Sequence, residues 1–417
     1  MALHRTTRTQ KLTYQGVNIC FAMFLLVTFS MCVPDVAHAQ EHSAVQIRLL
    51  DGTTLSSESV HWPESNSQIE LQTETGPQLI DWESVDVVEF DQPIRETNLS
   101  TSAIRLTSDD LLFVDSVHLL DEQIETEFAG QTIRIPIEMC RSMTFHTTPR
   151  LLHDSTGSLP NRDVVTLINN DQIQGDLIDF SREAVEIDCN LGNLSLPIEN
   201  IQSVQFNPIL STVLSLETSL ARIIFRNGSL LTVESIQHSQ TPDHIQLNVP
   251  ELGILDISID AVQRIESLAR PSVSIGQSIQ PQVATSDFFG SQLKSIWNRT
   301  PDGRTLLTDG RFFRDGIGVY PKTEIQLQVP ANARSFMTSV GLDDRQEDCG
   351  NVEATIFLDD VVLWTATLDA QSQRFATTPE IPVSPGSLKL VIDFGLRADL
   401  ADLTCWCQPR FFLDERR

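Results

Sequence analysis

Apolar and polar residues alternate in short runs along most of the chain from Val45 onward. A period of two places successive side chains on opposite faces of a strand, so each run predicts a strand with one buried face. Helical periodicity is absent from the C-terminal third, where the runs are longest. The hydrophobic pattern therefore predicts an all-β protein.

Between Val45 and Leu268 the pattern repeats four times. Each unit opens with a short alternating strand and a turn. Asp51-Gly52 and Asn227-Gly228 are strong hairpin signals, because both central residues of a type I′ turn need positive φ. The openings are VQIRLLDG from Val45, AIRLTSDD from Ala103, VVTLINND from Val164 and ARIIFRNG from Ala221.

Each unit also closes in the same way, with apolar-x-apolar-acid-x-apolar followed by a last short strand. The acid comes just after a strand, where a single helical turn could begin with its amides facing the carboxylate. These acids are Glu83, Glu138, Glu199 and Asp260.

Five short strands with a one-turn connection before the last are the plan of a small SH3-like or Sm-like barrel. The repeat therefore predicts an array of four five-stranded barrels, at residues 40–95, 96–150, 160–210 and 216–270. One continuous β-sandwich built from the same strands is the alternative. No ordered catalytic set occurs in this region, and we expect His61, His118 and His238, which occupy related positions, to be strand-edge residues.

A Pro-, Ser- and Gln-rich stretch at residues 271–282 breaks the pattern and predicts an interdomain linker. From residue 283 to residue 417 the predicted strands lengthen, and two of them carry near-continuous apolar stretches. Inner strands of a sandwich have this composition. Asp359-Asp360 marks a hairpin turn between two of these strands.

The first 39 residues have the pattern of a signal peptide. Arg5, Arg8 and Lys11 precede an apolar run, and the segment ends in a small-x-small motif at Ala39. This pattern predicts export to the periplasm, cell surface or medium, with no membrane span in the mature chain. An uncleaved N-terminal anchor is the alternative.

The charge and the cysteines of the chain limit which partners, metal sites and disulfides can be expected. The 417-residue chain has 56 acidic and 29 basic residues, a formal net charge of −27, which argues against nucleic acid as a partner. Five cysteines follow the predicted cleavage site, and their spacing matches no four-ligand zinc pattern. An exported protein can form disulfides, and we expect one between Cys349 and either Cys405 or Cys407. Cys140 and Cys189 are expected to act as small core hydrophobes.

Several landmarks of the C-terminal third occur in a fixed order. They are Ser286-Asp287, DGRFFRDGIGVYPKTEI from Asp309, FMTSVGLDD from Phe336, GNVEATIFLDDVVLW from Gly350, LKLVIDFG from Leu388 and CWCQPRF around Trp406. In this order they resemble the NPCBM module, a carbohydrate-binding module found beside glycoside hydrolase domains. The resemblance implies a jelly-roll β-sandwich of the galactose-binding type that binds glycans through loops at one end.

The chain departs from that family at three polar positions. Tyr320 stands where the family usually has a histidine, and Leu403 and Cys405 replace a histidine and an aspartate near the end. These departures weaken the implied sugar site but not the implied fold.

Glycan sites combine an aromatic face that stacks on a pyranose with polar groups that hydrogen-bond its hydroxyls. The candidate residues for such a site, three aromatic and three acidic, are Trp297, Tyr320, Trp406, Asp343, Asp344 and Asp402. The paired acids would also suit a structural calcium ion, and no other cofactor is expected. Trp364 follows an apolar strand and is expected in the core.

The sequence favours an exported, non-catalytic protein that binds a polysaccharide or glycoconjugate, with the barrels as spacer or assembly units. A structural protein whose barrels bind protein partners, and whose sandwich has lost its sugar site, is the alternative. A glycoside hydrolase is the third hypothesis, with Asp343 and Asp402 as the opposed carboxylates.

Overall fold

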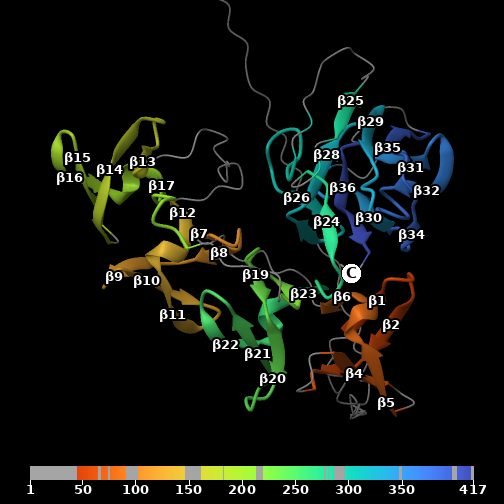
Figure 1. The fold of residues 1–417 in the computed structure, drawn as a ribbon, viewed down its shortest axis with the longest axis horizontal. Coiled ribbons are helices and arrows are strands. Elements are labelled where there is room, and N and C mark those ends of the chain that lie inside the picture. The colour runs from red at the N-terminus through yellow and green to blue at the C-terminus, as the bar shows by residue number, and fades with distance from the viewer. Residues whose placement is uncertain are drawn as a thin grey trace, which may run out of the picture. The chain divides into compact units, whose positions relative to one another are not determined.

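Strands make up nearly all the regular structure in the computed structural model (Figure 1). In the part of the chain that it describes, the helical pieces are four single 3-10 turns, so the predicted all-β class is confirmed. No helix among these residues is long and apolar enough to span a membrane. The structure describes residues 45–63, 67–73, 76–90, 102–145, 161–181, 183–212, 219–276, 279, 281–285, 295, 297–346, 350–396 and 402–414.

The described residues belong to one unit, His42–Arg417, whereas Met1–Glu41 form a separate unit that lies outside the description. The predicted signal peptide therefore also lies outside the described residues.

In repeat 1 (Val45–Phe90), the first strand pairs with both the second and the last. β3 follows β2 after one residue and pairs with β4 instead, so the chain passes from one small sheet to a second. The strands are β1 (Val45–Leu49), β2 (Thr54–Ser57), β3 (Ser59–His61), β4 (Gln68–Thr73), β5 (Gly76–Asp81) and β6 (Val85–Phe90).

Repeats 2 (Ser102–Phe145) and 4 (Ala221–Ser267) have the same strand order and pairing. The strands of repeat 2 are β7 (Ser102–Leu106), β8 (Leu111–Val114), β9 (Val117–Leu120), β10 (Gln123–Phe128), β11 (Gln131–Pro136) and β12 (Cys140–Phe145). Those of repeat 4 are β18 (Ala221–Phe225), β19 (Leu230–Val233), β20 (Ser235–His238), β21 (His244–Val249), β22 (Gly253–Ser258) and β23 (Val262–Ser267).

Repeat 3 (Asp163–Gln205) differs because its second strand is unbroken and pairs with the first strand and then with the third. A register shift between Leu177 and Asp179 marks the bend. The strands are β13 (Asp163–Leu167), β14 (Gln172–Phe180), β15 (Ala184–Cys189), β16 (Gly192–Pro197) and β17 (Ile201–Gln205).

The first turn of every repeat has one geometry, but it is not the predicted type I′. Gly52 N donates to Leu49 O at 3.0 Å, and Gly52 has φ of 89°. The two residues inside this turn lack positive φ, so it is a type I turn followed by a left-handed residue. The left-handed positions in the four repeats are Gly52, Asp109, Asn170 and Gly228.

The single helical turn predicted before the last strand is present in each repeat, with the predicted acid in its first turn. In repeat 4 the Ser258 side chain caps this turn by accepting a hydrogen bond from Asp260 N. The four turns are η1 (Trp82–Ser84), η2 (Ile137–Met139), η3 (Ile198–Asn200) and η4 (Ile259–Ala261).

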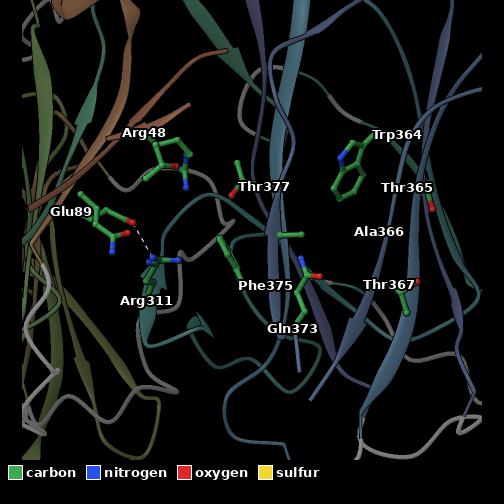
Figure 2. Close-up of a pocket in the computed structure, with 13 residues that line it drawn as sticks. Arg48, Glu89, Arg311, Trp364, Thr365, Ala366, Thr367, Gln373, Phe375 and Thr377 are labelled. Carbon is green, nitrogen blue, oxygen red and sulfur yellow. Dashed lines mark hydrogen bonds and ion pairs between the residues drawn. The ribbon is translucent and has the colours of Figure 1, made fainter. Parts of the chain in front are cut away.

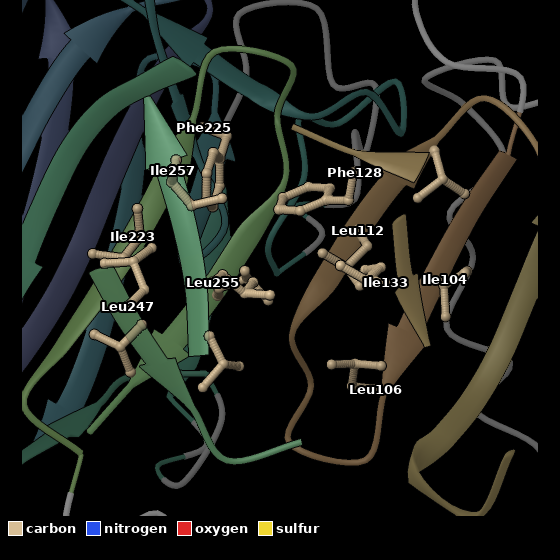
Figure 3. Close-up of a cluster of buried hydrophobic side chains, with 14 of the residues drawn as sticks. Ile104, Leu106, Leu112, Phe128, Ile133, Ile223, Phe225, Leu247, Leu255 and Ile257 are labelled. Carbon is tan, nitrogen blue, oxygen red and sulfur yellow. The ribbon is translucent and has the colours of Figure 1, made fainter. Parts of the chain in front are cut away.

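The repeats join edge to edge into a 14-stranded sheet. The last strands pair with each other, β6 with β23 and β12 with β17, while β8 meets β19 through one residue pair. Pairing of this kind satisfies backbone groups that an isolated unit would leave exposed at its edge. A single apolar core runs through all four repeats. Figure 3 shows the part of it from repeats 2 and 4, where the Phe128 and Phe225 ring centroids lie 5.0 Å apart.

The C-terminal third packs two antiparallel sheets around a second core. One sheet has the order β24-β36-β30-β33, with β28 and β34 at its side, and the other has the order β25-β29-β35-β31-β32. The strands of the first are β24 (Ser272–Ser274), β28 (Gly316–Val319), β30 (Ala333–Leu342), β33 (Phe375–Thr377), β34 (Ile381–Pro382) and β36 (Thr404–Leu413). Those of the second are β25 (Gln282–Thr285), β29 (Thr323–Gln328), β31 (Asn351–Leu358), β32 (Val361–Asp369) and β35 (Ser387–Phe394). A separate hairpin, β26 (Leu306–Thr308) with β27 (Arg311–Phe313), precedes β28.

The predicted linker differs from what the structure shows. β24 lies within residues 271–282 and pairs with the last strand, Ser272 opposite Phe412. Ile275, just after it, is fully buried in the sandwich core. Two apolar residues in a short polar stretch are enough to add an edge strand where a neighbour supplies the hydrogen bonds.

Candidate functional site

The structure brings three of the predicted site residues to one end of the six-stranded sheet. Thr404 of β36 lies opposite both Val319 and Leu342. Tyr320 and Asp343 come directly after those two residues, and Asp402 lies two residues before Thr404. The ends of β28, β30 and β36 therefore place Tyr320, Asp343 and Asp402 close together.

At this end Asp343 is fully buried. Its two oxygens accept from Arg345 Nε at 3.0 Å and from Arg345 Nη2 at 2.7 Å, and one also accepts from Arg345 N. This geometry is a bidentate ion pair within one loop. Asp343 therefore orders its own loop and presents no oxygen to solvent.

The other two acids also hold loops. Asp402 is buried, and its Oδ1 accepts from Asn351 N at 2.8 Å. Asp344 accepts from Asp309 N at 2.8 Å and from Gly310 N at 2.6 Å, which fixes the β26–β27 turn. Among the described residues no group of three or more His, Cys, Asp or Glu could hold a metal ion.

The electrostatics near Tyr320 are dominated by a second ion pair. Arg304 Nη2 lies 2.5 Å from Asp302 Oδ2 and interacts with both Asp343 and Tyr320. Burial raises the pKa of Asp302, but hydrogen bonds from Arg304 and Thr300 outweigh it and lower that pKa to about 2. The end of the sheet thus carries a network of ion pairs around a half-buried Tyr320.

The two predicted tryptophans lie elsewhere. Trp406 is fully buried in the sandwich core, where no sugar can reach its face. Trp297 is half-buried, bridges to Ile317, and packs its ring over Gly276, where an added Cβ would come within 2.4 Å of the ring. Leu403 and Cys405, the departures from the family pattern, are also buried.

The structure does not test the predicted disulfide between Cys349 and either Cys405 or Cys407. Cys405 and Cys407 are free, buried thiols that pack with Leu306 and Phe313. Burial raises the pKa of both thiols, so neither is a reactive thiolate. Their predicted partner, Cys349, lies outside the described residues.

A groove of about 530 Å³ lies between the sandwich and repeat 1. Its sandwich side is formed by β32 and β33, which are edge strands of the two sheets. Its other side carries Arg48, Glu89 and Arg311 (Figure 2). The volume is within the range of small-ligand sites.

Trp364 is the aromatic residue of this groove that sequence reasoning missed. Its side chain is partly exposed and also packs against the sandwich core, and Figure 2 shows it across the groove from Arg48 and Glu89. Thr365, Thr367 and Gln373 line the same groove with exposed hydroxyl and amide groups. An indole beside several neutral polar groups is the combination that a pyranose requires.

One signal in the sequence could have indicated this position. Trp364 begins a run, WTAT, in which threonines alternate with the other residues. That composition is typical of an edge strand with a wet face rather than of a fully buried strand. Val361 and Val362 in the same strand are 63% and 54% exposed, which agrees with an edge position.

The charged side of the groove is held in place by ion pairs. Arg311 Nη2 lies 2.8 Å from Glu89 Oε2, and its guanidinium sits 5.1 Å from the Phe375 ring centroid. Arg48 Nε lies 2.8 Å from the buried carboxylate of Asp86. These contacts fix the charged groups that face Trp364.

The C-terminal third is a sandwich of two packed antiparallel sheets with a groove beside its edge strands. Residues 278–412 match the model of the NPCBM/NEW2 domain. This match confirms the resemblance that the ordered landmarks predict for the C-terminal third.

Comparisons with other proteins give weaker likenesses. CBM51 from Clostridium perfringens GH95, solved in complex with methyl-galactose, is 17% identical with a TM-score of 0.30, over 34% of this chain and 99% of that chain. The tandem CBM51 modules of the family 98 glycoside hydrolase Sp3GH98 from Streptococcus pneumoniae are 11% identical with a TM-score of 0.30, over 79% and 93%. CBM51-2 and INT domains from Clostridium perfringens ZmpB are 14% identical with a TM-score of 0.30, over 43% of this chain and 40% of that chain. No curated protein matches the chain at a significant level.

Proposed function

We propose that this protein is an exported, non-catalytic carbohydrate-binding protein whose glycan site is the groove beside Trp364. The observation that carries the proposal is a partly exposed indole in a groove of about 530 Å³ beside an NPCBM/NEW2 domain. The groove takes the place of the end-loop site expected from the family. The acids at that end, Asp343 and Asp402, are buried and occupied by loop contacts.

Sugar recognition at the groove would follow from its lining. The apolar face of a pyranose would stack on Trp364, while Gln373 and Thr377, which line the same groove, would exchange hydrogen bonds with its hydroxyls. Glu89 and Arg311 are already paired with each other, so they can accept and donate at the rim without leaving a lone charge.

A non-catalytic role is supported by the carboxylates. Hydrolysis of a glycoside needs two opposed carboxyl groups roughly 5 to 10 Å apart. Among the described residues that line the groove, Glu89 is the one carboxylate, and it is ion-paired with Arg311. The groove therefore suits binding rather than hydrolysis.

The four repeats would act as spacer or assembly units. We interpret each repeat as a small SH3-like barrel, because its first strand pairs with both the second and the last, and in repeats 1, 2 and 4 the chain then passes into a second small sheet. The sandwich would be a jelly roll of the galactose-binding type. Residues 1–39 would be removed as a signal peptide on export.

Titration of the chain from residue 40 onward with neutral sugars such as galactose, and retention on neutral polysaccharide gels, test the proposal. Replacing Trp364 by Ala should weaken binding at least tenfold, because it removes a stacking surface worth about 1.5 kcal/mol. Val361→Ala is the matched control, since Val361 is exposed on the same strand and lies outside the groove lining. If the two variants bound sugar with equal affinity, the groove beside Trp364 would not be the glycan site.

A structural or protein-interaction protein is the second candidate, favoured by Leu403 and Cys405. Both stand where the family has polar residues, and both are buried. Under that hypothesis no neutral or acidic glycan is retained by the wild-type chain, and a defined protein partner is captured by cross-linking through the repeats.

A further inference from the structure

A second cavity, of about 600 Å³, concentrates positive charge in a strongly acidic protein. It lies where repeats 2 and 4 face the β26–β28 region of the sandwich. Seven arginines line it, among them Arg222, Arg264 and Arg314, whereas the whole chain has 29 basic residues and a net charge of −27. The guanidinium groups of such a cluster repel one another unless anionic groups lie between them.

The carboxylates of the cavity do not balance these arginines. Three line it: Asp109, Glu266 and Asp315. They pair with Arg141, Arg264 and Arg222 respectively, and Asp109 also lies 3.9 Å from Arg314. The lining therefore has seven arginines and three carboxylates, and one of the arginines, Arg345, pairs with Asp343 outside the lining.

Arg264 is the most deeply buried of these three arginines and has an unsatisfied donor. It is only 3% exposed, donates through Nε to Glu266 at 2.9 Å and through Nη2 to Phe312 O at 2.6 Å, and stacks on Phe313. Its buried Nη1 has no hydrogen-bond partner among the described residues. The Nε of Arg222 is in the same state. Buried donors without acceptors are costly and rare.

Arg314 supports the same conclusion. Its guanidinium is about one-fifth exposed, and Arg222 and Arg105 are close enough to repel it. Burial, together with those two arginines, lowers the pKa of Arg314. Crowded and partly desolvated cations are stabilised when an oxyanion binds between them.

Apolar rings complete the cavity. Phe113, Leu307 and Trp297 line it beside the arginines. A free inorganic anion has no apolar surface that could pack against these side chains. An acidic sugar has both an apolar ring face and a charged substituent. The positions of the arginines are fixed in advance by their contacts with Glu266 and Asp315, which lowers the cost of ordering them on binding.

We propose that this cavity is a second ligand site, which binds the sulfate or carboxylate group of an acidic saccharide through Arg222, Arg264 and Arg314. The saccharide part of this inference rests on the proposed function, while the oxyanion part rests on the cavity alone. The site is distinct from the groove beside Trp364.

Calorimetry on the chain from residue 40 onward, with galactose 6-sulfate, galacturonic acid, galactose and sodium sulfate, tests the inference. The two acidic sugars should bind at least tenfold more tightly than galactose or sulfate, and less tightly as salt rises. Arg314→Gln should weaken the acidic sugars about tenfold, since one charge-assisted contact is lost. Arg264→Lys keeps the charge but loses the planar donor pair, and should weaken them by a smaller factor.

Arg334→Gln is the matched control, because Arg334 is an exposed sandwich arginine outside the cavity. Its affinity for acidic sugars should equal that of the wild type, and thermal unfolding should verify that each variant is folded. Equal losses in Arg334→Gln and Arg314→Gln would overturn the site. Sulfate binding as tightly as galactose 6-sulfate would overturn the saccharide part and leave an adventitious ion only.

The two proposals fail in different ways. Trp364→Ala should reduce galactose binding and leave acidic sugars at the cavity unchanged, and Arg314→Gln should do the reverse. Galactose binding without any preference for acidic sugars overturns the cavity inference alone. Acidic-sugar binding that depends on Arg314, with no galactose binding, supports the inference and overturns the groove.

Discussion

Single carboxylates at the end of the sandwich act on the backbone of their own loops. Asp343, Asp344 and Asp402 each accept hydrogen bonds from backbone amides, and the first also holds Arg345. Asp343 is a structural residue, because it is fully buried and both of its oxygens are bound to Arg345. Trp364, by contrast, is partly exposed and lines the groove.

Replacement of Asp343 by Ala should destabilise the protein by about 3 kcal/mol, because it removes one partner of a buried ion pair. Asp343→Asn, which keeps an acceptor for Arg345 N, should cost less. Urea unfolding measures both. Sugar affinity at the groove should be unchanged in either variant, and a loss of binding without a loss of stability would contradict a structural role for this residue.

The junctions between repeats are made by strand edges and by one buried acid. Asp110, in the β7–β8 turn of repeat 2, accepts from Thr232 N at 2.6 Å and from Thr232 Oγ1 at 2.8 Å in β19 of repeat 4. Burial raises the pKa of Asp110 from its ordinary value to about 6, with Glu251 adding to the rise and the Thr232 hydrogen bonds opposing it. The junction between repeats 2 and 4 should therefore respond to mild acid.

A raised carboxyl pKa means that the folded protein binds this proton more tightly than the unfolded chain. The resulting stabilisation is complete below pH 3.8 and is lost as the pH rises through about 6. Asp110→Asn does not titrate and can keep both Thr232 contacts. The stability of the variant relative to wild type should rise by about 3 kcal/mol between pH 4 and pH 7. Urea unfolding at several pH values checks this, and parallel pH profiles would contradict it.

At the scale of the molecule, repeat 1 and the sandwich are tied by charged contacts around a small apolar cluster. Asp86 of β6 is 4% exposed and pairs with Arg48 in its own repeat and with Arg410 of β36. Arg270 makes two contacts of 2.8 Å with Glu380. Leu50, Met337 and Phe412 form the cluster. Of these residues, Arg48 also lines the groove beside Trp364.

Asp86→Asn should destabilise the protein by about 3 kcal/mol, because two largely buried arginines lose their shared carboxylate. It should also weaken sugar binding at the groove, since Arg48 lines it. Calorimetric unfolding and sugar titration measure the two effects. Asp360→Asn is the control: Asp360 is 90% exposed, and its contact with Lys389 should contribute less than about 1 kcal/mol. Equal shifts in both variants would refute the role of Asp86.

Much of the fold was predictable because its signals are local. The alternation of apolar and polar residues predicted the strands. The residues around Asp51-Gly52 predicted a turn near the right place, but the predicted type of turn was wrong. The type I′ prediction failed because the turn begins one residue earlier than predicted, at Leu49, and Gly52 is its left-handed residue. The ordered landmarks of the C-terminal third were enough to indicate its family, now confirmed at residues 278–412.

The candidate sites were decided by the tertiary structure alone. Whether Trp364 is core or surface depends on β32 being the outermost strand of its sheet, which no local pattern determines. Trp406 and Asp343 have the right chemistry for sugar, but neighbouring strands bury them. The arginine cavity draws on residues more than 200 positions apart, from Arg105 to Arg345, which only chain packing brings together. By itself the sequence determined strands, repeats and family, because these depend on neighbours along the chain. The structure decided which side chains remain accessible, because burial depends on neighbours in space.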